Sequence, residues 1–153
     1  MNLKDLLVSD AIVAKLDLLS RDQVIEKAGG LLVSAGTVLP QYIEAMRKVM
    51  EDLGPYCVIA PGIALLHARP ENGVIRSSLA LVTLKHPICF GHSTNDPVDL
   101  AFALAANDKK SHIDALAELA GYLSESNFLR VLRENTNSLS LKNSIFSYID
   151  NRK

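Results

Sequence analysis

The chain has 153 residues, of which 48% are hydrophobic and 22% are charged, and its formal net charge is −1. A chain of this length and composition is expected to fold as one domain, over residues 1–153, whose core needs no disulfide or metal crosslinks. The near-neutral charge gives no electrostatic basis for binding nucleic acid, which requires a basic stripe.

The N-terminal segment is apolar in patches, but charged side chains interrupt it at Asp5, Asp10, Lys15 and Asp17. It therefore matches neither a signal peptide nor a membrane-spanning helix, and we expect a cytoplasmic protein. No other stretch of the sequence reaches about 18 uninterrupted apolar residues.

Two helices are predicted in the first third of the chain. Ser20 with Gln23 three residues later is a capping-box pattern, and it predicts a helix that ends near Gly36. A second helix is predicted from Pro40, a residue type favoured at the first helical position, to Gly54.

Apolar runs predict three strands, at residues 56–60, 77–84 and 99–106, with the β signal continuing at residues 88–90. The Ala and Leu residues of the third run leave a helix open as the alternative there. Cys57 and Cys89 lie in such runs. We therefore expect buried free thiols and no disulfide.

Three helices are predicted in the last third of the chain. Ser111 is expected to cap the first of them, and shorter helices follow at residues 127–134 and 139–149. Because helices and strands alternate along the chain, the predicted fold class is α/β, with a mixed sheet and helices on its faces.

The segment APGIALLHARPENGV, residues 60–74, holds His67 in an apolar loop with Pro and Gly at each end. Three interpretations are open: a structural histidine in the core, a metal ligand, or a reactive group presented on a shaped loop. Loops that follow strands carry function in open α/β sheets. Arg69 would bring a positive charge near the ring.

His112 follows a predicted strand end and lies in the first turn of a predicted helix. Free N–H groups at such a place attract anions, and the helix dipole disfavours a charged imidazole. A neutral ring can donate one hydrogen bond to an oxyanion. The sequence thus suggests that His67 accepts a phosphate and His112 stabilises it, with an exposed surface role for His112 as the alternative.

Common catalytic motifs are absent: there is no P-loop, no Gly-x-Gly-x-x-Gly and no Gly-x-Ser-x-Gly. His86, Cys89 and His92 form a metal-like cluster, but alternation along a strand would direct Cys89 away from the two histidines. We therefore expect no metal and no cofactor. A zinc-binding module that uses these three residues, together with His67, is the alternative.

Three segments carry a family resemblance: GPYCVIAPGIALLHARPENGV, ALVTLKHPICF and NDPVDLAFALAA. Together they resemble the enzyme IIA components of the sugar phosphotransferase system, of the mannitol/fructose type. The pattern GPY-V-APG-A--H-RPE-GV is most similar to the ascorbate-specific branch. The resemblance extends over nearly the whole chain, from the first capped helix to the last.

The resemblance implies a mixed sheet of about five strands with helices on both faces. It implies that His67 accepts a phosphoryl group on Nε2 from phosphohistidine on the carrier protein HPr, and passes it to a cysteine of enzyme IIB. His112 falls where the family places its second active-site histidine. Enzyme IIC, in the membrane, would carry the sugar, and L-ascorbate is the sugar that the resemblance favours.

Two positions depart from the family pattern. Members usually carry a proline directly before the active histidine, whereas this chain has Leu66; leucine gives up the restraint that a proline ring places on the loop. Mannitol-type members also carry an arginine on the preceding helix, but the spacing of Arg47 does not match, and we assign it no such role. A regulatory relative of the nitrogen type, which binds partners according to the phosphorylation of His67, is the alternative function.

Overall fold

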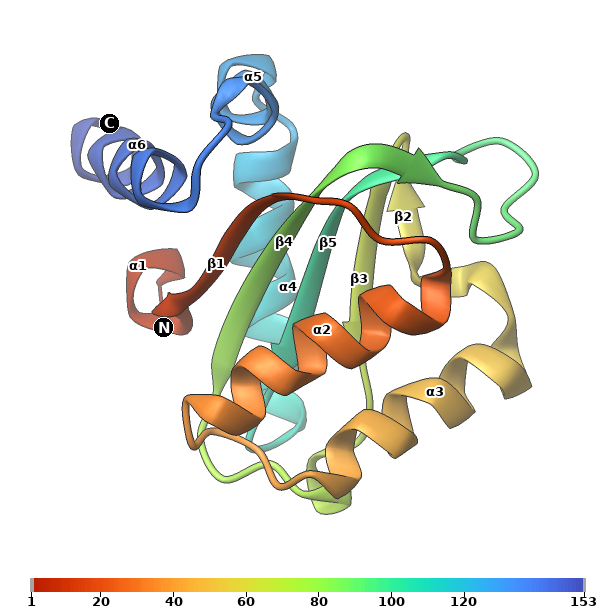
Figure 1. Cartoon of the computed structure of the whole chain (residues 1–153). Coiled ribbons are helices and arrows are strands. Elements are labelled where there is room, and N and C mark those ends of the chain that lie inside the picture. The colour runs from red at the N-terminus through yellow and green to blue at the C-terminus, as the bar shows by residue number, and fades with distance from the viewer. Residues whose placement is uncertain (1, 153) are drawn as a thin grey trace.

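The computed structural model describes residues 2–152 and contains a five-stranded sheet with α-helices on both faces (Figure 1). The strand order is β1-β4-β5-β3-β2. The elements are α1 (Leu3–Leu6), β1 (Leu7–Leu16), α2 (Arg21–Ser34), α3 (Gln41–Leu53), the 3-10 turn η1 (Pro55–Cys57), β2 (Val58–Ala60), β3 (Ile63–His67), the 3-10 turn η2 (Pro70–Asn72), β4 (Ser78–Ile88), β5 (Val98–Ala105), α4 (Lys109–Leu123), α5 (Ser126–Glu134) and α6 (Ser138–Asn151).

The sheet is mixed, as predicted. β4 pairs antiparallel with β5, while β1 pairs parallel with β4 and β3 pairs parallel with β5. The short strand β2 closes one edge, antiparallel to β3. β3 and β5 are almost wholly buried, which explains why their sequences are continuous apolar runs without polar alternation.

Alternation of side chains along the strands divides the core into two layers. On one face, Ala64 and Leu66 of β3 pack in the layer that holds α2 and α3. On the other face, Ile63 and Leu65 pack in the layer that holds α4, α5 and α6. Figure 1 shows α2 and α3 in front of the sheet and α4 behind it.

Both helices predicted in the first third are confirmed. The Ser20 side chain accepts a hydrogen bond from the Gln23 amide at the start of α2. α3 begins directly after Pro40, and its C-cap is Gly54. The predicted strands at 77–84 and 99–106 correspond to β4 and β5.

The segment before Ser20 forms two elements that its interrupted pattern does not indicate, α1 and β1. The register of β1 against β4 shifts twice, and Lys15 has a φ of 55°. These irregularities remove the period-two alternation by which a strand is recognised in sequence.

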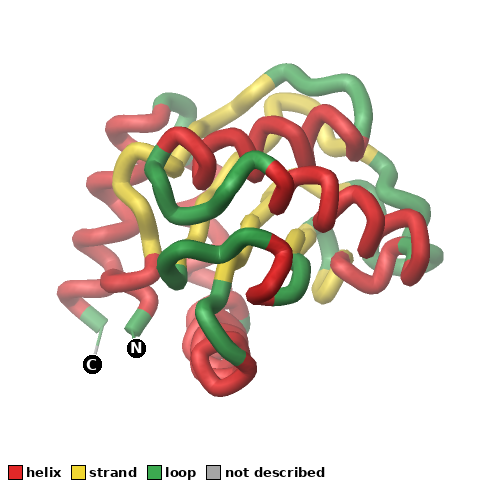
Figure 2. The backbone as a smooth tube through the Cα atoms, turned by 90° about the horizontal axis from the view of Figure 1, so that it is seen from below, coloured by secondary structure: helices red, strands yellow, loops and turns green. Residues whose placement is uncertain are grey.

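The two ends of the described chain lie beside each other in Figure 2. There the Nζ atom of Lys4 in α1 lies 2.7 Å from Asp150 Oδ1 in α6. Both side chains are about half exposed, so this ion pair adds little to the free energy of unfolding.

The predicted strand over residues 56–60 is confirmed only over its last three residues, and the predictions that it is buried and that a loop holds His67 are wrong. The edge strand β2 covers only Val58–Ala60, and Tyr56 is 82% exposed. A turn at Gly62 leads into β3, the buried strand, and His67 is its last residue. The apolar middle of the quoted segment is therefore a central strand of the sheet.

The prediction of two buried thiols is also wrong. Cys89 is exposed, and Cys57 is half-buried, where desolvation raises the pKa of its thiol to about 11. The exposure of Cys89 follows from the end of the sheet: β1 pairs with β4 only as far as Leu84, so the last residues of β4 lie beyond their neighbour strand. Pro87 fits there because no ladder bond is required of it.

Candidate functional site

His67 ends β3 at the edge of the sheet where β5 also ends, because the two strands are parallel and His67 is in register with Leu104. Its side chain follows Ile63 and Leu65 in the alternation of β3, and so faces the layer of α4. The half-buried ring is thereby held by a strand of the core and presented at its end.

His112 comes from the next element after β5. It lies in the first turns of α4, and its ring centroid is 5.2 Å from that of His67, with the planes tilted by 41°. The fold thus brings together two histidines that are far apart in the sequence. The predicted acceptor, His67, and the predicted stabiliser, His112, therefore lie in one site.

The N-cap of α4 is Asp108, and the prediction that Ser111 caps this helix is wrong. The Asp108 carboxylate accepts a hydrogen bond from the Ser111 amide, with Oδ1 at 2.8 Å. Hydrogen bonds from Ser111 lower the pKa of Asp108 below its ordinary value. The Ser111 amide is therefore engaged with the protein's own carboxylate.

The environment of His112 favours the neutral form of its ring. Burial disfavours its charged form and the neighbouring His67 repels it, so the pKa of His112 lies below its ordinary value of 6.5. A neutral imidazole keeps one N–H donor and one lone pair, the state that the sequence analysis expects.

One ring nitrogen of His67 already makes a hydrogen bond within the protein. Nδ1 lies 3.2 Å from the Leu65 carbonyl oxygen. A carbonyl can only accept, so this contact requires the proton on Nδ1 and leaves the lone pair on Nε2. The last register pair between β2 and β3 is Val58 with Ala64, so the Leu65 carbonyl lies beyond the short edge strand.

His67 and His112 line a surface depression of about 720 Å³. Its floor and rim combine apolar side chains from α3 with two cationic and two anionic ones. Arg69 lines it as an exposed side chain. The other lining residues are Val49, Leu53, Ala68, Pro70, Glu71, Asn107, Asp108 and Lys109.

Val49 and Leu53 are therefore apolar neighbours of the site, together with Ala68 and Pro70. Ile63, Leu65 and Leu66, which precede His67 in the sequence, are buried in the two core layers.

Tyr42, on α3, is a residue that the sequence analysis does not connect with the site. It is fully buried, and its hydroxyl lies 2.9 Å from the Ala68 amide and 2.7 Å from the Leu104 carbonyl. Its only signal in the sequence is a position on the apolar face of a predicted helix, where an aromatic ring is ordinarily a core residue.

Residues 5–150 match the family model for the phosphoenolpyruvate-dependent sugar phosphotransferase system, EIIA 2. The chain belongs to this family. The predicted resemblance to enzyme IIA of the mannitol/fructose type is thus confirmed.

Among curated relatives, the ascorbate-specific EIIA component of Escherichia coli K12 is 50% identical over 82 residues. That match covers 54% of this chain and 53% of the relative, so the chain spans about half the length of the curated relatives it matches.

Solved structures of EIIA proteins share the fold. The mannitol-specific cryptic enzyme IIA CmtB from Escherichia coli superposes with a TM-score of 0.83 at 28% identity, over 95% of this chain and 98% of that one. Enzyme IIA of mannitol from Escherichia coli, solved in complex with phosphorylated enzyme IIB, gives a TM-score of 0.77 at 22% identity, over 92% and 96%.

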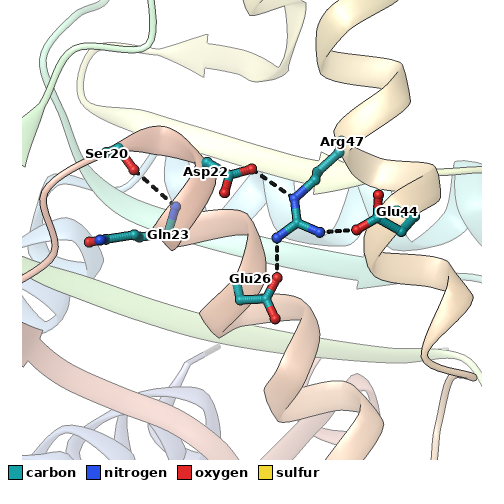
Figure 3. Close-up of polar contacts among 6 residues, drawn as sticks. All are labelled: Ser20, Asp22, Gln23, Glu26, Glu44 and Arg47. Carbon is teal, nitrogen blue, oxygen red and sulfur yellow. Dashed lines mark hydrogen bonds and ion pairs between the residues drawn. The ribbon is translucent and has the colours of Figure 1, made fainter.

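Arg47 of this EIIA chain faces the neighbouring helix. Its guanidinium contacts Asp22 and Glu26 of α2 and Glu44 of α3, as Figure 3 shows. The hydrogen bond to Asp22, with Nε at 2.7 Å from Oδ1, is the largest cause that raises the pKa of Arg47 above its ordinary value. Arg47 ties α2 to α3 and does not line the depression around His67.

His86, Cys89 and His92 do not gather as metal ligands. His86 lies in β4 and not in a loop, whereas His92 lies in the following loop, where Nδ1 accepts from the Thr94 and Asn95 amides. Within residues 2–152, no three or more His, Cys, Asp or Glu side chains are arranged to hold a metal ion. None of the helices in this part of the chain is long and apolar enough to cross a bilayer.

Proposed function

We propose that this EIIA chain, acting as one domain over residues 1–153, accepts a phosphoryl group on Nε2 of His67 from phospho-HPr and passes it to a cysteine of its enzyme IIB. The observation that carries the proposal is the pairing of His67 with His112, at 5.2 Å between ring centroids, in an open depression at the end of β3. The contact of Nδ1 with the Leu65 carbonyl supports Nε2 as the nucleophile.

The first transfer exchanges one P–N bond for another. The Nε2 lone pair of His67 attacks phosphorus, the P–N bond to the HPr imidazole breaks, and that imidazole takes the electron pair. In the second transfer a cysteine thiolate of enzyme IIB attacks phosphorus, a P–S bond forms, and Nε2 recovers its lone pair. The proton stays on Nδ1 of His67 throughout, and this N–H donates a hydrogen bond to the Leu65 carbonyl oxygen.

The transition state of such a transfer is loose, with negative charge on three equatorial oxygens, so the protein contributes positioning and electrostatic stabilisation. His112, held neutral, donates its N–H to one oxygen, and Arg69 on the rim supplies positive charge. The apolar side chains of Val49 and Leu53 exclude water that would hydrolyse the phosphohistidine.

We propose L-ascorbate as the transported sugar, carried by a membrane enzyme IIC. The support is the 50% identity to an ascorbate-specific EIIA component over half the chain, together with the motif that surrounds His67. Enzyme IIB as a partner is supported by the complex in which a mannitol enzyme IIA of the same fold was solved. These partners imply a cytoplasmic location.

The test is phosphorylation from labelled phosphoenolpyruvate with the system's own kinase and HPr. We expect acid-labile label on the wild-type chain, none on His67→Ala, and transfer slowed at least tenfold in His112→Ala. Full label uptake by His67→Ala would refute the acceptor assignment. Passage of label to the enzyme IIB of an ascorbate system, and not to that of a mannitol system, would support the sugar.

Two arginine variants test the role of Arg69. Arg69→Met is expected to slow transfer by about tenfold, because it removes a positive charge from the rim. Arg47→Met is the matched control, since Arg47 is engaged with α2, and it is expected to transfer at the wild-type rate. Label uptake without transfer to any enzyme IIB would favour the regulatory alternative.

A further inference from the structure

The Tyr42 hydroxyl lies at the point where β3 and β5 separate. Tyr42 belongs to the core layer of α2 and α3, and its ring reaches from α3 to the strand ends. The hydroxyl accepts from the Ala68 amide at 2.9 Å and donates to the Leu104 carbonyl at 2.7 Å. Ala68 directly follows His67, and Leu104 is the register partner of His67.

The Tyr42 hydroxyl replaces one backbone hydrogen bond of the parallel pairing between β3 and β5. The Leu100 amide donates to Gly62 O at 3.0 Å, which shows that the carbonyl of Gly62 points toward β5. Because peptide groups of alternate residues point to the same side of a strand, Ala64, Leu66 and Ala68 also direct their amides toward β5. The next hydrogen bond of this pairing would run from the Ala68 amide to the Leu104 carbonyl. The Tyr42 hydroxyl instead bonds to both of these groups.

An inserted hydroxyl sets the distance between the two strand ends. β3 ends in His67, whereas β5 leads through a short loop to α4 and His112. The separation of Ala68 from Leu104 therefore bears directly on the separation of the two rings. With the hydroxyl removed, the amide and carbonyl either stay buried without a partner or close onto each other, and either change displaces the His67 backbone.

We propose that Tyr42 is a positioning residue for phosphoryl transfer, whose hydroxyl fixes the end of β3 so that the His67 ring meets His112 with its Nδ1 on the Leu65 carbonyl. This inference rests on the proposed function of His67. Burial raises the pKa of Tyr42 to about 12, so the hydroxyl keeps the proton that it donates to Leu104 throughout the neutral range.

The test variant is Tyr42→Phe, which keeps the ring and removes only the hydroxyl. In single-turnover transfer from phospho-HPr, the first-order rate is expected to fall about 10- to 100-fold, because a displacement of about 1 Å costs this much in a positioned reaction. The half-saturating concentration of phospho-HPr is expected to stay unchanged, since the depression is lined by other residues.

A nitrogen-15 spectrum of the histidine rings provides a second measurement that needs no phosphate. The wild type is expected to show the tautomer with Nδ1 protonated, and Tyr42→Phe a mixture of both tautomers at His67. If the wild type took up no label, the proposed function would fall, while this spectrum would still decide the role of Tyr42.

Two control variants distinguish a positioning role of the Tyr42 hydroxyl from a general contribution to the stability of the fold. Tyr148→Phe loses a hydroxyl that contacts Glu125 in the layer of α5 and α6. Met46→Ala opens the core one turn after Tyr42 but keeps the hydroxyl. Both are expected to transfer at the wild-type rate. The proposal is overturned if Tyr42→Phe matches the wild type in rate and spectrum, if Met46→Ala is slowed equally, or if Tyr42→Phe does not fold.

Discussion

Two histidines near the strand ends carry the proposed chemistry of this EIIA protein. His67 has one nitrogen tied to a backbone carbonyl, and His112 is kept neutral by burial and by its neighbour. The carbonyl belongs to Leu65, two residues earlier in β3, whereas the His67 ring that neighbours His112 comes from a different element. The types and positions of the two histidines are visible in the sequence, whereas the tautomer and the charge state are set only when the fold brings these groups together.

The neutral state of His112 makes stability depend on pH. Its pKa is lower in the folded chain than the ordinary 6.5, so in the window just below 6.5 the unfolded chain binds more protons. Stability is then fully present above 6.5 and is lost as the pH falls toward the folded pKa. Urea unfolding between pH 7.5 and 5 is expected to show a smaller loss for His112→Gln than for the wild type.

His86→Gln is the control for this experiment, because His86 is exposed on β4, outside the depression around His67. It should lose stability with falling pH as the wild type does. An identical pH dependence in His112→Gln and the wild type would contradict the assignment.

The backbone amide of Leu66 contributes to stability. Leu66 is 2% exposed, paired with Ala103, and directs its amide toward β5. Leu66→Pro would delete that donor and leave a buried acceptor, so the free energy of unfolding is expected to fall by about 1–3 kcal/mol. Urea titration measures this loss. Leu66→Ile keeps the amide and should lose less than about 1.5 kcal/mol; equal losses in the two variants would show that the amide is unimportant.

At the scale of elements, the pattern of the sequence predicts well where one local signal dominates. Ser20 and Pro40 mark the starts of α2 and α3, and apolar runs mark β4 and β5. The failures share one physical cause. In residues 60–74, Pro and Gly at the ends suggest a loop, yet pairing with β5 turns the middle into β3. Pairing with β4 likewise forms β1 from an interrupted pattern. Such non-local pairing leaves no local trace.

The turn that opens β3 depends on a glycine. Gly62 has a φ of +77°, and a Cβ there would lie 2.7 Å from Asp99 Oδ1 and 2.8 Å from an Arg133 nitrogen. These two side chains form an ion pair that joins β5 to α5. Gly62→Ala is therefore expected to lower the free energy of unfolding by more than about 1 kcal/mol.

Gly30 provides the matched control in the interior of α2. It has no strained φ, and nothing lies within 4 Å of an added Cβ. Gly30→Ala should raise stability by about 0.5–1 kcal/mol, because alanine loses less backbone entropy in a helix. Chemical denaturation of both variants checks the pair, and a stabilising Gly62→Ala would show that the turn tolerates a side chain.

At the scale of the whole molecule, the site lies at one end of a sheet whose strands are covered on both faces. Parts of β3, α3 and α4 and the loop after β5 line the site, whereas α5 and α6, in the same layer as α4, contribute no lining residue. The fold class and the two histidines can be predicted from the sequence, whereas the ring-to-ring contact and the involvement of α3 cannot. These depend on how layers stack, a property of the assembled fold.

This arrangement predicts a local response to phosphorylation. When His67 is phosphorylated, changes in backbone amide chemical shifts are expected at the ends of β3 and β5, the last turns of α3 and the first turns of α4. The amide shifts of α5 and α6 should stay unchanged, because no residue of these two helices lines the depression. Two-dimensional NMR before and after phosphorylation measures this, and shifts spread over α6 would contradict it.

The position of His67 at the end of a core strand also affects the rate at which partner proteins associate with the site. A histidine on a mobile loop would have to be captured in the correct conformation each time a partner arrived, and the association rate would include that search. Here β3, paired with β5 through His67, holds the proposed acceptor in place beforehand. Under the proposed function, partners dock nearly as rigid bodies, and successive carriers exchange at this one surface at rates set by diffusion and charge.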